Sequence, residues 1–279
     1  MNRTFFRCCF VIALTIFGIA CNDQQQSSAT GEQQQQPQLK EEKVTYSDGD
    51  VTLNGYIVYD ESVKEKRPAV LVVHEWWGQT AYPRKRARDL AALGYVAMAV
   101  DMYGDGKTAD NPKDAEALAG PIYGDPALAK RRVEAALATI RQSAVADTSR
   151  IAAIGYCFGG GILLNVAKLG ADLDGVVSFH GNLVSDVPVK KELLHAKILV
   201  CHGSSDPFVP EQEAGTFKKQ MDSIGADYTF KAYPDAMHAF TNPEATEKGK
   251  QFNIPIAYNA AADSASWKDM QAFLNTIFQ

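Results

Sequence analysis

Residues 150–169 read RIAAIGYCFGGGILLNVAKL, and this segment decides the fold prediction. Its first part is a short apolar run typical of a buried strand, and its last part is apolar enough for a buried helix. Between them, the spacing Gly155-x-Cys157-x-Gly159 predicts a sharp turn with glycines where side chains would collide. Such a turn would expose the Cys157 sulfur above the sheet. The alternative interpretation is a buried structural cysteine before a helix.

The rest of the chain alternates similar apolar runs with segments of helical spacing. The runs are too continuous for half-exposed strands, and they lie at 69–73, 95–100, 150–154, 174–179, 197–201 and 228–232. Helical spacing of apolar residues surrounds Ala87, Val133, Phe217 and Trp267. This alternation predicts an α/β sandwich, with a mostly parallel central sheet flanked by helices.

Turn residues complete the expected organisation. Alternating residues on either side of Asp48-Gly49 predict an antiparallel N-terminal hairpin. Because no internal repeat or second composition shift follows, residues 43–279 are expected to form one domain. The segment 103–126 is rich in Gly, Asp and Pro and is long for a connection, so we expect a lid there.

The composition excludes several classes of protein. The chain has 279 residues, of which 46% are hydrophobic and 22% charged, as in ordinary globular domains and unlike disordered or fibrous chains. Its formal net charge is -5 and it contains no dense basic cluster. Nucleic acid is therefore not an expected partner.

The amino-terminal residues predict export. Residues 1–20 combine a basic start with an apolar stretch too short to span a bilayer, which is typical of a signal peptide. Small residues before Cys21 resemble the bacterial lipobox, so we expect Cys21 to be lipidated and to anchor the chain in the bacterial cell envelope, periplasmic or at the surface. Ordinary secretory cleavage is the alternative. Residues 22–42 are rich in Gln and Ser and predict a flexible tether.

Three residues have the order of a catalytic triad. Besides Cys21, the mature chain would keep Cys157 and Cys201, which we expect to be free thiols with different roles. A thiol is mostly protonated at neutral pH, so a nucleophilic Cys157 needs a base. His238 would be that base and Asp206 would orient it; all three follow predicted strands, whose carboxyl ends meet at one edge of a parallel sheet.

Other residues compete for these roles. His202 is an alternative base, although we expect it to be packed at a strand end, and His195 is expected to be solvated. Asp235 is an alternative acid, although its closeness to His238 favours a turn-capping role. No set of histidines and carboxylates has the spacing of a zinc site, so we expect no metal and no cofactor.

The segment HEWWG at 74–78 follows the first buried run. We assign the oxyanion hole to the backbone amides of Trp76 and Phe158. Glu75 is unusual, because an acidic residue near a nucleophile would oppose thiolate formation. The alternative interpretation of Glu75 is a surface ion pair.

Four motifs in this order resemble the dienelactone hydrolase family over about residues 43–279: HEWWG with Glu75, GYCFGG at 155–160, HGSSD at 202–206 and DAMHAF at 235–240. The resemblance implies an α/β-hydrolase fold and hydrolysis of a lactone or activated ester through a thioester, with Cys157, Asp206 and His238 as the triad. It also implies that Glu75 holds the resting thiol until substrate arrives. Family members carry a substrate-binding arginine where this chain has Asn242, so the resemblance leaves the substrate open.

The substrate pocket is expected to be lined by Trp77, Tyr156, His180 and Phe240, with core packing as the alternative for Trp77 and His180. Basic residues within 84–88 are candidates to replace the missing arginine, although an exposed helix face is the commoner explanation. The leading hypothesis is a Cys-dependent hydrolase of a small ester or lactone. The alternative is a non-catalytic, surface-anchored ligand-binding lipoprotein, and a thiol redox function is disfavoured because Cys157 lacks a Cys-x-x-Cys partner.

Overall fold

A computed structural model of the protein describes residues 36–279. The predicted signal peptide, Cys21 and most of the predicted tether lie outside the described residues. One sheet of eight strands forms the centre, in the order β1-β2-β4-β3-β5-β6-β7-β8. The strands are β1 Leu39–Asp48, β2 Val51–Asp60, β3 Arg67–Val73, β4 Val96–Val100, β5 Ala146–Tyr156, β6 Gly175–Phe179, β7 Lys197–Gly203 and β8 Tyr228–Tyr233.

The sheet is mostly parallel, as the sequence predicted. Strands β3 to β8 pair in parallel, whereas β2 pairs antiparallel with both β1 and β4. The hairpin turn lies at Gly49, whose φ of 58° is in the left-handed region that glycine tolerates. The fold prediction, including the N-terminal hairpin, is therefore confirmed.

The hairpin begins earlier than the tether prediction allowed. Strand β1 starts at Leu39, opposite Asp60 of β2, so the end of the segment predicted as tether to residue 42 belongs to the sheet. The Glu41 carboxylate accepts hydrogen bonds from Arg84 and Arg88 of helix α1, Ala81–Ala92. These contacts with a distant helix extend the strand, and the local Gln-rich composition does not reveal them.

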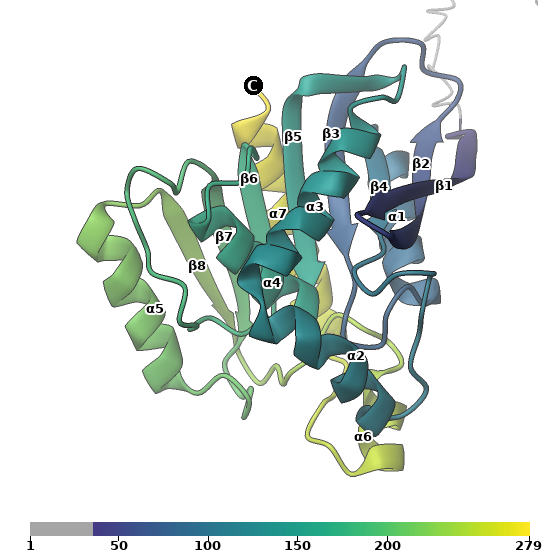
Figure 1. The fold of residues 1–279 in the computed structure, drawn as a ribbon. Coiled ribbons are helices and arrows are strands. Elements are labelled where there is room, and N and C mark those ends of the chain that lie inside the picture. The colour runs from purple at the N-terminus through teal and green to yellow at the C-terminus, as the bar shows by residue number, and fades with distance from the viewer. Residues whose placement is uncertain (1–35) are drawn as a thin grey trace, which may run out of the picture. The chain divides into compact units, whose positions relative to one another are not determined.

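Helices cover both faces of the sheet (Figure 1). They are α1 Ala81–Ala92, α2 Pro112–Gly124, α3 Pro126–Ile140, α4 Phe158–Lys168, α5 Glu211–Ile224, α6 Ala245–Phe252 and α7 Ala260–Ile277. Helices α3, α4 and α5 bury apolar residues against one face, and α1 and α7 against the other. The two resulting apolar layers hold the strand ends, and hence the loops that follow them, in fixed positions.

The segment predicted to be a lid contains a packed helix. Helix α2 begins after Asn111, whose side chain accepts a hydrogen bond from the Asp114 amide at 3.1 Å. Ala119 and Ile122 of this helix are buried in the core. The interpretation of this part as a long connection is therefore wrong, because a capped start and a buried face outweigh the Gly and Pro content; the lid role stays a prediction. Helix α6 was also not predicted.

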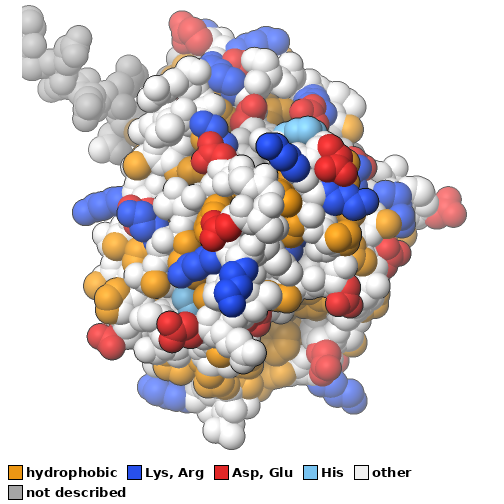
Figure 2. Space-filling model, turned by 90° about the vertical axis from the view of Figure 1, so that its left-hand side faces the viewer, with side chains coloured by type: hydrophobic (Ala, Val, Ile, Leu, Met, Phe, Trp, Pro, Cys, Tyr) orange, Lys and Arg blue, Asp and Glu red, His pale blue; other side chains and the backbone are white. Residues whose placement is uncertain are grey.

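The surface carries charges of both signs. On the face shown in Figure 2, Lys and Arg side chains are interspersed with Asp and Glu side chains. Within residues 36–279, no helix combines the length and the apolar character that crossing a bilayer requires.

Candidate active site

The turn that carries Cys157 has the geometry that the glycine spacing predicted. Strand β5 ends at Tyr156, helix α4 begins at Phe158, and Cys157 between them has a φ of 51°. A Cβ atom on Gly155 would lie 2.3 Å from the Gly159 carbonyl oxygen, a contact that no side chain can make. Cys157 is half-buried and lines a cavity, so the alternative of a sealed structural cysteine is wrong.

His238 and Asp206 meet beside this turn. Asp206 follows β7 and His238 follows β8, and the His238 Nδ1 lies 2.8 Å from Asp206 Oδ2. Both side chains are buried. Burial disfavours the charged ring, but the charge and hydrogen bond of Cys157 and those of Asp206 outweigh it and raise the pKa of His238 to about 10. The arrangement therefore favours an imidazolium next to the Cys157 sulfur.

The competing candidates lie elsewhere. His202 is buried within β7 and packs against Phe230, with a ring-centroid distance of 5.6 Å. His195 is exposed, as predicted. Asp235 is also exposed, in a turn with a φ of 57°, and the His238 ring binds Asp206 instead.

The two backbone amides assigned to the oxyanion hole face no internal acceptor. In the part of the chain that the structure describes, neither the Trp76 nor the Phe158 N–H donates a hydrogen bond. The neighbouring backbone is fixed, because the Tyr103 hydroxyl donates to the Trp76 carbonyl at 3.0 Å and the Gly159 N–H donates to the His74 carbonyl at 3.1 Å. Both amides are thus held in place without a hydrogen-bond partner among the described residues.

Glu75 is buried, with only 3% of its surface exposed, so the surface ion-pair interpretation is wrong. Its Oε2 accepts a hydrogen bond from Asn242 Nδ2 at 2.6 Å. Burial raises the pKa of Glu75 to about 7, although the hydrogen bond from Asn242 and the charges of Lys248 and His238 oppose this shift. Among residues 36–279, no hydrogen bond joins Glu75 to Cys157, so the contact that the resemblance implied is not seen.

A mostly apolar cavity of about 200 Å³ connects these groups. Its lining consists of Glu75, Trp76, Trp77, Cys157, Asn182, Phe208, His238, Ala239, Ile254 and Ile256. Trp77 lines it as predicted and is also packed in the core. Tyr156, His180 and Phe240 do not: each is at most 1% exposed and is buried beneath the cavity, which corrects the pocket prediction.

Sequence reasoning missed several lining residues. Ile254 and Ile256 follow helix α6, and a single bridge pairs Ile256 with His238. Phe208 stands against the His238 ring with a centroid distance of 5.1 Å. These residues carry no local signal of function. Tyr123, in the segment predicted as a lid, packs its ring edge on Phe158 at 5.0 Å.

The basic residues near 84–88 are all engaged away from the cavity. Arg84 and Arg88 bind Glu41, and Lys85 binds Asp89. Arg86 is buried and paired with Asp263. None of these cations replaces the arginine that the family carries at the position of Asn242.

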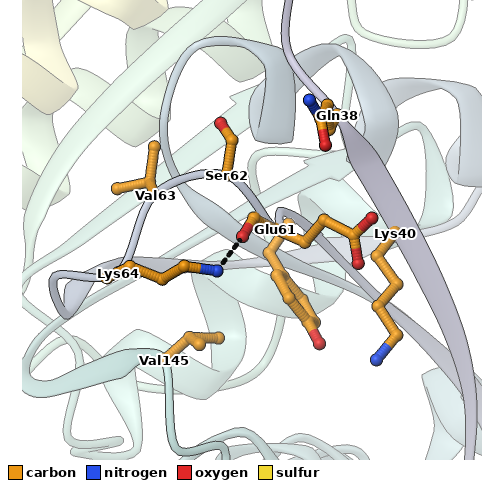
Figure 3. A pocket seen from close by; sticks show the side chains of 8 residues that line it. Gln38, Lys40, Glu61, Ser62, Val63, Lys64 and Val145 are labelled. Atoms are coloured by element: carbon orange, nitrogen blue, oxygen red, sulfur yellow. Dashed lines mark hydrogen bonds between the residues drawn. The ribbon is translucent and has the colours of Figure 1, made fainter.

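A second hollow and a second thiol among the described residues lie outside the site formed by Cys157, His238 and Asp206. A hollow of about 550 Å³ lies beside the start of β1, where Lys64 donates to the Glu61 carbonyl at 2.8 Å (Figure 3); its lining contains neither cysteine nor histidine. Cys201 is a free, fully buried thiol in β7. Within residues 36–279, no three His, Cys, Asp or Glu side chains form a group that could hold a metal ion.

Comparisons with known proteins identify the family of this chain. An uncharacterized protein of Caenorhabditis elegans is 33% identical over 151 residues, covering 53% of this chain and 94% of that one. Protein usf of Aquifex pyrophilus is 29% identical over 209 residues, covering 71% of this chain and 86% of that one. The crystal structure of a dienelactone hydrolase-like promiscuous phosphotriesterase from metagenomic libraries is 33% identical, with a TM-score of 0.81 over 86% of this chain and 99% of that one. Residues 53–278 match the model of the dienelactone hydrolase family, so this chain is a hydrolase that belongs to that family.

Proposed function

We propose that this enzyme hydrolyses uncharged carboxylic esters or lactones through a thioester on Cys157, with His238 and Asp206 completing the triad. The observation that carries the proposal is the meeting of three features at one cavity. These are the Cys157 turn, the 2.8 Å contact between His238 and Asp206, and the unpaired amides of Trp76 and Phe158.

The reaction follows from these positions. The Cys157 thiolate attacks the carbonyl carbon, and the resulting oxyanion accepts hydrogen bonds from Trp76 and Phe158. The ester C–O bond then breaks, and the His238 imidazolium gives its proton to the alkoxide, which in a lactone stays attached to the acyl group. His238 next takes a proton from water, whose oxygen attacks the thioester carbon and releases the acid and the thiolate. Each oxyanion donor is expected to supply about 3 kcal/mol of transition-state stabilisation.

The preference for an uncharged substrate follows from the cavity lining. No Lys or Arg is among the residues that line it, and Glu75 is its one carboxyl group. A substrate carboxylate there would lose its hydration in an apolar space and would lie close to the thiolate. The Asn242 amide is bound to Glu75. Lys248 pairs with Glu244 at 3.3 Å and lies 4.8 Å from the Trp77 ring centroid.

Glu75 is compatible with this mechanism. Because burial raises its pKa to about 7, a large part of the Glu75 population is uncharged near neutral pH. An uncharged carboxyl group does not repel the Cys157 thiolate. This removes the electrostatic conflict that the sequence alone suggested.

The test compares two activated esters of matched size on the full chain. 4-Nitrophenyl pentanoate is uncharged, and the mono-4-nitrophenyl ester of succinic acid carries a carboxylate. We expect kcat/KM to favour the uncharged ester by at least about tenfold, equivalent to about 1.4 kcal/mol. A preference for the anionic ester would contradict the uncharged substrate class. Ligand binding without turnover of either ester would contradict the hydrolase assignment, and full activity of Cys157→Ala would contradict the thioester.

We further propose that the chain is exported and that Cys21 carries a lipid anchor. The supporting observation is the sequence of residues 1–42, most of which lies outside the described residues. Metabolic labelling with an alkyne fatty acid, followed by membrane fractionation, tests this proposal. Wild type should be labelled and sediment with membranes, whereas Cys21→Ser should lose the label. An unlabelled wild-type chain cleaved at another residue would support ordinary secretion instead.

A further inference from the structure

A buried polar network lies directly beneath the nucleophile turn. His180 follows β6 and is 1% exposed, and its Nδ1 accepts a hydrogen bond from the Cys157 backbone N–H at 3.1 Å. The same N–H also donates to the Phe179 carbonyl oxygen at 2.9 Å, so it is shared between two acceptors. On the other side of the ring, Nε2 lies 2.8 Å from Thr241 Oγ1. The His180 ring thus spans the distance from the Cys157 amide to the Thr241 hydroxyl.

The directions of these hydrogen bonds fix the proton on His180. Burial and the charges of His238 and Arg86 hold the pKa of His180 well below its usual value, so the ring is neutral and carries one proton. Because Nδ1 accepts from an N–H, that proton is on Nε2. Nε2 therefore donates to the Thr241 hydroxyl.

The far end of the network is tied to helix α1. Arg86 Nε donates to the Tyr82 hydroxyl at 3.2 Å, so this hydroxyl directs its own proton to Thr241 Oγ1, 2.6 Å away. The Arg86 guanidinium also donates to the Thr241 carbonyl at 2.8 Å and pairs with Asp263. Thr241 Oγ1 therefore accepts from two donors and cannot rotate away without leaving one of them unpaired in the core.

Thr241 belongs to the loop that carries His238. This loop also contains Asn242, which binds Glu75. The His180 ring therefore connects the chain segment of the nucleophile to the chain segment of its base. The His180 and His238 rings lie close to each other, with a centroid distance of 5.4 Å.

We infer that His180 and Thr241 are positioning residues: their hydrogen bond holds the Cys157 turn and the His238 loop at the separation that proton transfer requires. This inference rests on the proposed roles of Cys157 and His238. The bridge needs the neutral ring with its proton on Nε2, because only that tautomer accepts from the Cys157 amide and donates to Thr241. His180 itself does not line the cavity and has no expected contact with substrate.

The experiment compares Thr241→Val, which replaces the hydroxyl with a methyl group, with Thr241→Ser, which keeps the hydroxyl. Two quantities are measured: kcat and KM for 4-nitrophenyl pentanoate, and the rate of Cys157 alkylation by iodoacetamide against pH. Thr241→Val should lower kcat by about tenfold to a hundredfold, leave KM within about twofold, and move the alkylation curve to higher pH. Thr241→Ser should keep most of the wild-type kcat and most of the wild-type alkylation curve.

A merely structural role predicts a different result. Thr241→Val would then lower the melting temperature but leave kcat per folded molecule and the alkylation curve unchanged, which would overturn the inference. Alkylation needs no turnover. If the wild type hydrolyses no ester but the curve still shifts in Thr241→Val, the bridge stands and the proposed hydrolysis fails.

A direct measurement covers the case in which Thr241→Val does not fold. Nitrogen-15 NMR of the wild-type His180 ring should show an unprotonated Nδ1 and a protonated Nε2. The opposite tautomer, or a charged ring at neutral pH, would overturn the inference.

Discussion

The loop after β6 and the loop after β8 each present a buried histidine to the same site, and the two rings differ in charge. His180 and His238 are both nearly inaccessible to solvent and lie 5.4 Å apart. Burial and neighbouring positive charge lower the pKa of His180, whereas Cys157 and Asp206 raise that of His238. The two rings are similarly buried, so burial does not explain why their protonation states differ. The charged and hydrogen-bonding groups around each ring explain the difference.

The different charges of the His180 and His238 rings suit them to different roles at the same edge of the sheet. The charged ring of His238 can give and take protons because its partners stabilise the imidazolium. The neutral ring of His180 can only hold hydrogen bonds in fixed directions. The comparison also shows why two histidines so close together do not repel each other as two cations would.

Removing the thiol should have the largest effect. Cys157→Ala is expected to lower kcat by at least about a thousandfold, because the nucleophile is lost. It should also lower the pKa of His238 toward that of His180, since the anion beside the ring disappears. Ester hydrolysis and an NMR titration of His238 measure both results. Cys201→Ala is the matched control, and loss of hydrolysis in that variant alone would contradict the assignment of Cys157.

Removing the second charged partner should have the next largest effect. Asp206→Asn is expected to lower kcat by about 10³- to 10⁴-fold, because the amide no longer stabilises the imidazolium or holds its orientation. Steady-state kinetics test this expectation. Asp235→Asn is the control, because Asp235 is exposed and its left-handed conformation suits Asn. Similar losses in the two variants would mean that the 2.8 Å contact between Asp206 and His238 has no role.

Replacing Glu75 should have the smallest effect. It extends the comparison of buried titratable groups from histidine to a carboxylic acid. Its pKa is raised to about 7, so the folded state binds this proton more tightly than the unfolded state. Stability from this group is therefore fully present below pH 4.5 and is lost as pH rises through about 7. Glu75→Gln should reduce the pH dependence of unfolding free energy between pH 5 and pH 8 by at most about 3 kcal/mol.

Urea unfolding at the two pH values measures this difference. Glu247→Gln on α6 is the control, since that side chain is 78% exposed. An unchanged pH dependence in Glu75→Gln would show that burial does not hold the Glu75 proton.

Much of the fold could be predicted from local sequence, but two helices could not. The predicted apolar runs all form parallel strands. The expected burial on both faces is wrong for β8, which lies at the edge of the sheet and is mostly exposed or half-buried. Helix α2 contains Gly120 and Pro121, which argue against a helix, and its buried face is recognised only once it packs on the core. Glu41 shows the same limit, because its partners in α1 lie far along the chain.

The candidate site also has parts that the local sequence predicts and parts that it does not. The Cys157 turn could be predicted from its glycine spacing, and a Cβ on Gly155 would collide with Gly159 only four residues along the chain. A Cβ on Gly159 would instead meet the Val73 and His74 carbonyls, which only the fold brings close. The partner of Glu75 could not, because Asn242 lies 167 positions away and reaches it only through folding. The pocket prediction failed for Tyr156, His180 and Phe240 for the same reason: sequence position does not tell which side of a strand end faces the cavity.

The order of the strands, the helices with regular apolar spacing and the Cys157 turn follow from the sequence by itself. Steric contact and apolar periodicity act over a few residues and can be read along the chain. The charge of each titratable group, the lining of the cavity and the bridge through His180 are decided only by the tertiary structure. Protonation depends on burial and on partners from distant segments, and both exist only after the sheet brings its carboxyl-end loops together.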